Sequence, residues 1–238
     1  THLGGTTRER ALRMNAAAVA LPCVESIADR AMVAPRYTSY PPATAFGPQT
    51  DRLAKAELAR LGKDRAPLSV YVHVPFCRSL CWYCGCNVTI SRNADRGDVF
   101  VDTIATEMVR VAEALGAPAP VTEVSLGGGS PNFLRPAALT KLATAIGRYF
   151  AVTPDARRSI ELDPRATTPE QIDALAAAGW NTVSIGVQDF DLAVQEIIGR
   201  HQSVAETTAL VKAVRAAGVD DLNMDLIYGL PRQTEASM

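Results

Sequence analysis

Residues 70–86 read Val-Tyr-Val-His-Val-Pro-Phe-Cys-Arg-Ser-Leu-Cys-Trp-Tyr-Cys-Gly-Cys, so a strand-like apolar run leads directly into four cysteines. Three of them, Cys77, Cys81 and Cys84, have the spacing CxxxCxxC. Thiolates this close along the chain can converge on one metal centre, and they are the usual ligands of zinc and of iron–sulfur clusters. The stretch therefore predicts a metal centre at the end of a strand.

The type of metal centre depends on how many ligands the sequence offers. A structural zinc site pairs one half-site with a second one farther along the chain, and the remaining cysteine, Cys23, stands alone. Cys86 is a fourth ligand on paper, but the spacing Cys84-Gly-Cys86 is too short to reach adjacent corners of a tetrahedron easily. A 4Fe-4S cluster on three cysteines leaves one iron open, and a substrate or cofactor can bind there.

Composition favours a globular enzyme-sized domain. The chain has 238 residues, of which 47% are hydrophobic, enough to bury one substantial core. Its net charge of -1 shows no electrostatic footprint for nucleic acid or an anionic membrane, and its longest apolar stretch is too short to span a bilayer. Free thiolates require a reducing compartment, so we expect a cytoplasmic protein. We also expect a monomer without nucleic-acid or membrane partners.

Strand-like and helix-like segments alternate along the chain. Apolar runs predict strands at 70–74, 121–126, 159–162, 182–187 and 222–227. Helical patterns lie between them, at about 98–115, from 136, from 168 to 179 and from 203 to 218, the last two beginning with capping boxes. Such strand-then-helix units predict an α/β fold with a parallel sheet, either doubly wound or curved toward a barrel.

Unusual polar groups follow the predicted strands. In both architectures ligands bind at the carboxyl ends of parallel strands, so we expect these groups to share one site. In chain order they are the cysteines, Gly127-Gly128-Gly129-Ser130-Pro131, Glu161-Leu162-Asp163-Pro164-Arg165, Gln188-Asp189, and Asp225 with Tyr228-Gly229-Leu230-Pro231.

Seven ordered motifs resemble a known family, the radical S-adenosylmethionine (SAM) superfamily and, within it, the oxygen-independent coproporphyrinogen III oxidases. The resemblance begins near Pro35 and continues to the last residue. The motifs are Arg36-Tyr37-Thr38-Ser39-Tyr40-Pro41, Tyr71-Val72-His73-Val74-Pro75-Phe76-Cys77, Cys84-Gly85-Cys86-Asn87, the glycine loop at 127–131, the segment at 161–165, Gly186-Val187-Gln188-Asp189-Phe190 and Asp225-Leu226-Ile227-Tyr228-Gly229-Leu230-Pro231.

The resemblance implies a fold and a reaction. Residues 51–238 would form a partial (β/α) barrel of the radical SAM type, truncated before a carboxyl-terminal domain, and residues 1–50 an amino-terminal extension on the substrate side. A 4Fe-4S cluster and two SAM molecules would be the cofactors. A 5'-deoxyadenosyl radical from SAM would be the reactive species, so no side chain is assigned as catalytic. With a low-potential electron donor, the enzyme would convert two propionates of coproporphyrinogen III to vinyl groups, giving protoporphyrinogen IX for haem biosynthesis.

The resemblance also implies residue roles. The cluster ligands are Cys77, Cys81 and Cys84. The residues matched to SAM contacts are Tyr71, Tyr83, Gly128, Gly129, Ser130, Glu161, Gln188, Arg200 and Asp225. Cys86 marks this branch of the superfamily, and its own role is left open.

Three other functions compete with this one. A sister radical SAM branch binds haem and transfers or degrades it, but its members typically carry phenylalanine where Cys86 stands. A non-catalytic iron–sulfur electron carrier or redox sensor would not require the glycine loop and the strand-end carboxylates. A zinc-stabilised binding module is disfavoured by the ligand spacing.

Overall fold

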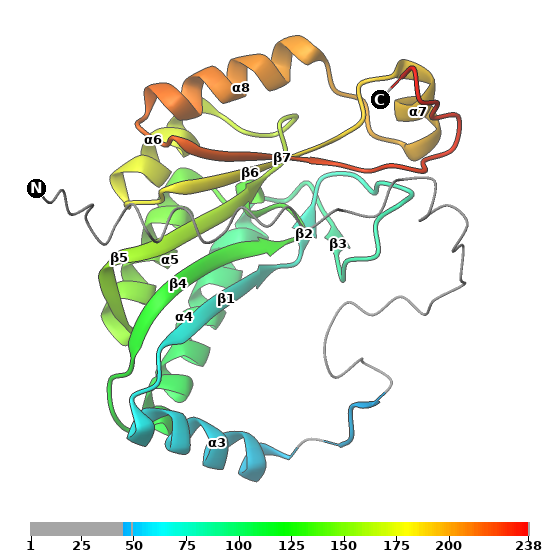
Figure 1. The fold of residues 1–238 in the computed structure, drawn as a ribbon. Coiled ribbons are helices and arrows are strands. Elements are labelled where there is room, and N and C mark those ends of the chain that lie inside the picture. The colour runs from blue at the N-terminus through cyan, green and yellow to red at the C-terminus, as the bar shows by residue number, and fades with distance from the viewer. Residues whose placement is uncertain (1–44, 49, 238) are drawn as a thin grey trace, which may run out of the picture. The chain divides into compact units, whose positions relative to one another are not determined.

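A computed structural model describes residues 45–48 and 50–237, and residues 50–237 lie in one compact unit, drawn in Figure 1. Its helices are α3 (Asp51–Asp64), α4 (Asp95–Leu115), α5 (Pro136–Tyr149), α6 (Pro169–Ala177), α7 (Leu192–Ile198) and α8 (Val204–Ala216), with a 3-10 turn η2 (Pro131–Phe133). Its strands are β1 (Leu68–Val74), β2 (Phe76–Cys77), β3 (Thr89–Ile90), β4 (Pro120–Gly128), β5 (Ala151–Leu162), β6 (Thr182–Gln188) and β7 (Asp221–Leu226).

The main sheet has five parallel strands in the order β1-β4-β5-β6-β7, which is also their order along the chain. A sheet built in sequence order with crossovers of one hand places every crossover helix on the same face. Figure 1 shows α4 and α5 behind the sheet, and α4 packs on α5, α5 on α6 and α6 on α8. The predicted partial (β/α) barrel of parallel strands is therefore confirmed.

Local sequence signals explain where two of these helices begin. The side chains of Thr168 and Ser203 each accept a hydrogen bond from the backbone N–H three residues on. The side chains of Gln171 and Glu206 in turn accept one from the backbone N–H of the capping residue. Both predicted capping boxes are confirmed. A capping side chain of this kind contributes about 1 kcal/mol by satisfying backbone donors at the helix start.

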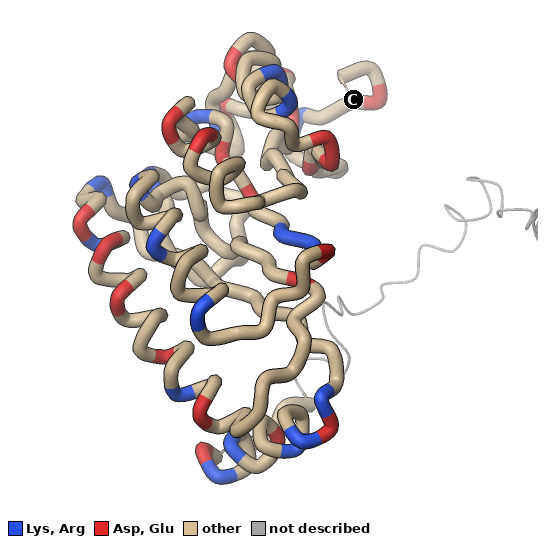
Figure 2. The backbone as a smooth tube through the Cα atoms, turned by 90° about the vertical axis from the view of Figure 1, so that its left-hand side faces the viewer, with Lys and Arg blue, Asp and Glu red and all other residues tan. Residues whose placement is uncertain are grey.

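The hydrophobic core lies between the sheet and the helical layer. Alternate residues of the strands point into it, among them Val74, Leu126 and Ile185, which are almost completely buried. Leu139 and Leu142 of α5 pack in the same cluster. Burying each such side chain contributes about 1.5–3 kcal/mol. On the outer side of the helices, Lys and Arg are interspersed with Asp and Glu (Figure 2).

The opposite face of the sheet is polar. Neighbouring strands place serine beside serine there, with Ser125 Oγ and Ser159 Oγ 2.7 Å apart. On β6 the hydroxyl of Ser184 donates to the carboxylate of Asp225 on β7 at 2.8 Å. The strands therefore separate an apolar face, which holds the fold together, from a polar face that leads to the strand ends.

Some elements differ from the sequence prediction. Helices α3 and α7 and the short strands β2 and β3 were not predicted. Strand β5 begins at Ala151, eight residues before the predicted start at Ser159. Its ladder with β4 is interrupted between Val121 and Glu123, and Pro154 lies in the extra loop of β5 formed there. Proline has no N–H to donate to a ladder, and a bulge tolerates it because its residues are not paired with the neighbouring strand.

No helix among the residues placed by the structure combines the length and apolar character that a membrane span requires.

Candidate functional site

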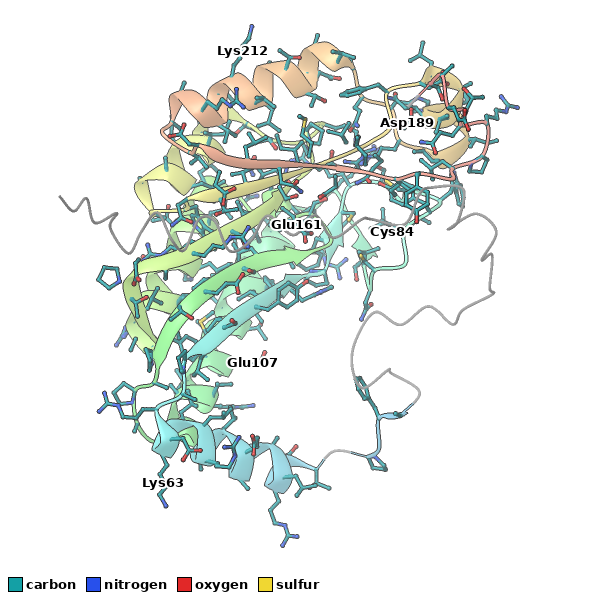
Figure 3. All side chains as sticks on the ribbon, viewed as in Figure 1. Lys63, Cys84, Glu107, Glu161, Asp189 and Lys212 are labelled. Atoms are coloured by element: carbon teal, nitrogen blue, oxygen red, sulfur yellow. The ribbon has the colours of Figure 1, made fainter. Side chains whose placement is uncertain are left out.

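A cavity of about 170 Å³ lies at the carboxyl ends of the strands. Figure 3 labels Cys84 and Glu161, two of the residues that line it. Its lining includes every residue predicted for the site except Tyr71: Cys77, Cys81, Tyr83, Cys84, Gly128, Gly129, Ser130, Glu161, Gln188, Arg200 and Asp225. The structure thus brings together the residues that we expected at the carboxyl ends of the strands.

Residues 77–86, the cysteine loop, are held against two other elements. Cys77 ends the short strand β2, and its Sγ lies 3.7 Å from Ser130 Oγ. The backbone N–H of Trp82 donates to Ile198 O at the end of α7 at 2.9 Å. Cys81 is buried, while Cys84 is partly exposed. Burial raises the pKa of the Cys77 thiol, and the hydrogen bond with Ser130 opposes this effect.

The donor set fits an iron–sulfur cluster. The four cysteines of the described part of the chain are free thiols, and all of them line the cavity. In residues 45–48 and 50–237, no three His, Cys, Asp or Glu side chains are close enough to hold a single metal ion. A 4Fe-4S cluster is larger than one ion, and each cysteine ligand binds a different iron, so the ligands need not meet at a point. Cys77, Cys81 and Cys84 are suited to such a group.

The glycine loop at 127–131 holds the end of β4 against β1 and β2. Gly129 N–H donates to Val74 O at 2.9 Å, and Ser130 N–H donates to Phe76 O at 2.7 Å. A Cβ on Gly129 would lie 2.7 Å from both of these carbonyl oxygens. Gly128 has φ of 101°, and a Cβ there would lie 2.4 Å from the ring of His73. Only glycine fits these positions, whether or not a ligand is bound.

Two arginines surround the Cys81 sulfur, and the sequence reasoning missed one of them. Arg200 Nη1 lies 3.6 Å and Arg165 Nη2 lies 3.7 Å from Cys81 Sγ. Asp163 joins the two, with its carboxylate 2.6 Å from Arg165 Nη2 and 3.4 Å from Arg200 Nη2. Two guanidinium groups at one sulfur are positioned to donate charge-assisted hydrogen bonds to a cluster ligand. The signal for Asp163 and Arg165 was present in the motif at 161–165, but nothing in it indicated the direction of the side chains.

Two carboxyl groups lie on another wall of the cavity. Glu161 is open to the cavity, but the protein atoms around it reduce its hydration and raise its pKa. The backbone N–H of Gly128 opposes this shift, and the charge of Asp225 adds to it. A pair of carboxyl groups in a cavity is suited to a ligand with a cationic group or with hydroxyl donors.

The end of strand β6 is strained at Gln188. This residue has φ of 70°, which is unusual for a side chain other than glycine, and the ladder with β7 shifts register between Gly186 and Gln188. Arg200 Nη2 donates to Gly186 O, and Arg200 Nε has no hydrogen-bond partner among the residues that the structure describes. A buried guanidinium N–H without a partner is suited to an acceptor on a ligand.

Tyr71 and Cys86 differ in their relation to the cavity. Tyr71 is 58% exposed and its hydroxyl lies 3.2 Å from His73 Nδ1, whose ring also contacts Asn87 O through Nε2 at 2.9 Å. The structure thus places Tyr71 beside the cavity and not in its lining. Cys86 is exposed and lines the cavity. Cys23 and the motif at 36–41 lie outside the described residues.

Comparisons with known proteins agree with this arrangement. The Radical SAM superfamily matches residues 71–238. The chain is 43% identical over 203 residues to a protein of Bradyrhizobium diazoefficiens named oxygen-independent coproporphyrinogen III oxidase, covering 85% of this chain and 45% of the relative. A protein of the same name from Escherichia coli is 40% identical over 203 residues, covering 85% of this chain and 44% of the relative.

A solved structure of coproporphyrinogen III oxidase (HemN) from Escherichia coli, described as a radical SAM enzyme, superposes with a TM-score of 0.78 at 38% identity. The match covers 84% of this chain and 46% of the HemN chain. The chain spans a little under half the length of these relatives. The matched residues include the whole cysteine loop and every described strand after it, and the chain therefore belongs to the radical SAM superfamily.

Proposed function

We propose that the protein is an oxygen-independent coproporphyrinogen III oxidase, which decarboxylates two propionate side chains of coproporphyrinogen III to vinyl groups and yields protoporphyrinogen IX. The observation that carries this proposal is the single cavity in which three cysteine thiols, the glycine loop and the strand-end polar groups meet. The names of the relatives, which are 43% and 40% identical to this chain, supply the substrate.

Within this proposal, Cys77, Cys81 and Cys84 hold a 4Fe-4S cluster. When bound, the cluster and SAM would supply the radical chemistry that the reaction of the propionates requires. Ser130 orients Cys77 through the contact between their side chains.

The remaining lining residues bind and orient SAM. The carboxylates of Glu161 and Asp225 accept hydrogen bonds from ammonium or ribose hydroxyl groups, and the unpartnered N–H of Arg200 donates to a carboxylate. Gln188, Tyr83 and the backbone of Gly128 and Gly129 complete the wall. Tyr71 approaches from the adjoining strand. Two SAM molecules remain part of the proposal because the family resemblance implies them.

Further parts of the proposal concern the surroundings of the site. We propose residues 51–238 as the radical SAM partial barrel and residues 1–50 as an amino-terminal extension. A low-potential electron donor reduces the cluster. The free thiols support a cytoplasmic location. We further propose a monomer, which size-exclusion chromatography with light scattering would test.

The experiment is an anaerobic assay of the reconstituted protein with a low-potential reductant, SAM and coproporphyrinogen III. We expect release of 5'-deoxyadenosine and carbon dioxide, with vinyl-bearing porphyrinogen as the product. A matched control replaces Glu161 by glutamine, which keeps the size of the side chain and removes its charge. We expect that variant to keep its cluster and to cleave SAM more slowly.

Different negative results separate the competing functions. Protein that cleaves SAM but never decarboxylates coproporphyrinogen III would refute the substrate. Stoichiometric haem binding in place of decarboxylation would favour the haem-binding branch. A cluster that changes redox state without any SAM cleavage would favour an electron carrier or redox sensor.

A further inference from the structure

We propose that Arg165 is a positioning residue for the iron–sulfur cluster, which donates a hydrogen bond to the Cys81 thiolate and raises the reduction potential of the cluster. The proposal rests on the proposed function only in requiring a 4Fe-4S cluster at the cysteine loop. It adds a residue that lies outside the set matched to cluster ligands and SAM contacts.

The guanidinium of Arg165 is fixed before any cluster binds. Asp163 accepts from Arg165 Nε at 2.9 Å, from Nη2 at 2.6 Å and from the backbone N–H at 3.0 Å. These three bonds orient the plane of the guanidinium, and Nη2 is then 3.7 Å from Cys81 Sγ. Because the sulfur atom is large, this separation is a hydrogen-bond distance. The donor is therefore preorganised toward the sulfur.

Burial makes the interaction strong. The side chain of Arg165 is 20% exposed, that of Asp163 is 11% exposed, and Cys81 is 8% exposed. Burial opposes the charge on Arg165, but the hydrogen bonds and charge of Asp163 raise its pKa, so the guanidinium stays cationic. Electrostatic interactions in such surroundings are screened less than at the surface.

A cationic donor at a ligand sulfur acts differently on the two redox states of a cluster. Reduction adds an electron, and part of the added charge lies on the sulfur ligands. A hydrogen bond to such a sulfur therefore stabilises the reduced state more than the oxidised state and raises the potential. Arg200 is a second donor to the same sulfur, but it also binds Gly186 O and has a free N–H for a ligand. Arg165, whose guanidinium bonds go to Asp163 and Cys81, isolates the effect on the cluster.

The test is the midpoint potential of the reconstituted chain, measured by EPR-monitored redox titration without SAM or substrate. In Arg165→Gln we expect the ratio of reduced to oxidised cluster at a fixed potential to fall by about tenfold, the effect of a typical charge-assisted hydrogen bond. This corresponds to a midpoint about 59 mV more negative for a one-electron couple. Arg165→Lys keeps the charge but loses the fork, and we expect a smaller shift in the same direction.

Arg157→Gln is the matched control. Arg157 lies on β5, is 59% exposed, and pairs at 3.7 Å with Glu123. Its replacement removes the same charge as Arg165→Gln without changing a contact of the cysteine loop. We expect its midpoint to equal that of the parent chain. If the loss of one positive charge anywhere on the protein changed the potential, Arg157→Gln and Arg165→Gln would shift the midpoint equally. That result would overturn the proposal.

The remaining outcomes also decide the question. An unchanged midpoint in cluster-loaded Arg165→Gln or Arg165→Lys would overturn the proposal, since a purely structural ion pair with Asp163 predicts that result. Loss of the cluster from both variants, with unchanged circular dichroism, would overturn it as well, because Arg165 would then be needed for assembly. Failure of the decarboxylation assay would leave these measurements unaffected, because they use neither SAM nor porphyrinogen.

Discussion

Asp163→Asn would leave two guanidiniums in the wall of the cavity without their carboxylate. Arg200 and Arg165 are 7% and 20% exposed, so water cannot fully replace the lost partner. Breaking a buried ion pair from one side costs about 3–5 kcal/mol, because the remaining charge stays buried. Since Arg165 keeps some contact with solvent, we expect the lower end, about 3 kcal/mol.

Urea denaturation followed by circular dichroism measures this loss. With a slope of about 2 kcal/mol per molar urea, the midpoint should fall by about 1.5 M. The matched control is Asp102→Asn, which removes an exposed ion pair with Lys141, where both side chains are more than half exposed. Exposed pairs contribute about 0–1 kcal/mol, so we expect the control to shift the midpoint by less than about 0.5 M.

The pH dependence supplies a second, independent measurement. Burial alone would raise the pKa of Asp163, but the hydrogen bonds from Arg165 and the charge of Arg200 hold it below its ordinary value. A carboxyl group whose pKa is lowered by folding stabilises the fold fully above its unfolded pKa, which is about 3.9, and loses that contribution as the pH falls through the folded pKa. The difference between parent and variant should therefore be constant from about pH 6 to 7 and shrink below about pH 4.

Two results would refute this reasoning. A variant within about 0.5 kcal/mol of the parent at pH 7 would show that Asp163 carries no buried ion pair, because surface substitutions typically have effects of that size. A difference that stays constant to the lowest pH at which the protein is folded would show that the pKa of Asp163 is not lowered.

Three further changes have defined outcomes. Gly128→Ala should destabilise the protein by at least about 2 kcal/mol in urea denaturation, because Gly128 has φ of 101° and a Cβ there would meet His73. The control Gly147→Ala, in open space on α5, should stabilise the protein by up to about 1 kcal/mol. Equal effects of the two substitutions would contradict the backbone strain at Gly128. Ser203→Ala should cost about 1 kcal/mol by the same assay, and no loss would mean that its capping box is idle. Cys86→Ser should keep full iron content and visible absorbance after reconstitution, and loss of iron would make Cys86 a ligand.

Long patterned elements of the fold could be predicted from the sequence. Strands β1, β4 and β6 have apolar residues on the buried face, and helices α6 and α8 have complete capping boxes. The pattern of β7 also predicted a strand, although only its Leu222 packs against the core. Helix α3 has no comparable signal, since its buried residue is Gly62, held against the carbonyl of Leu115. Short elements such as α7 depend on contacts with distant segments, here with the cysteine loop, and local sequence does not encode those contacts.

The site was predictable where it depends on position along a strand. Residues that follow parallel strands share one edge, and for that reason Glu161, Gln188 and Asp225 were expected together. The direction of a side chain within that edge depends on packing. Arg165 was therefore visible in the motif, but its contact with Cys81 could be seen only after the strand and the cysteine loop were placed together.

The division of the sheet into an apolar and a polar face has a consequence for how this protein can change over time. Stability depends on the layer of valine, leucine and isoleucine beneath the helices, whereas Ser125, Ser159 and Ser184 on the other face contribute little to that layer. Of the three serines, Ser184 alone contacts a residue that lines the cavity, because its hydroxyl donates to the carboxylate of Asp225. Exchange of Ser184 can therefore turn the Asp225 carboxylate within the cavity at small cost in folding, which makes this position a starting point for engineering.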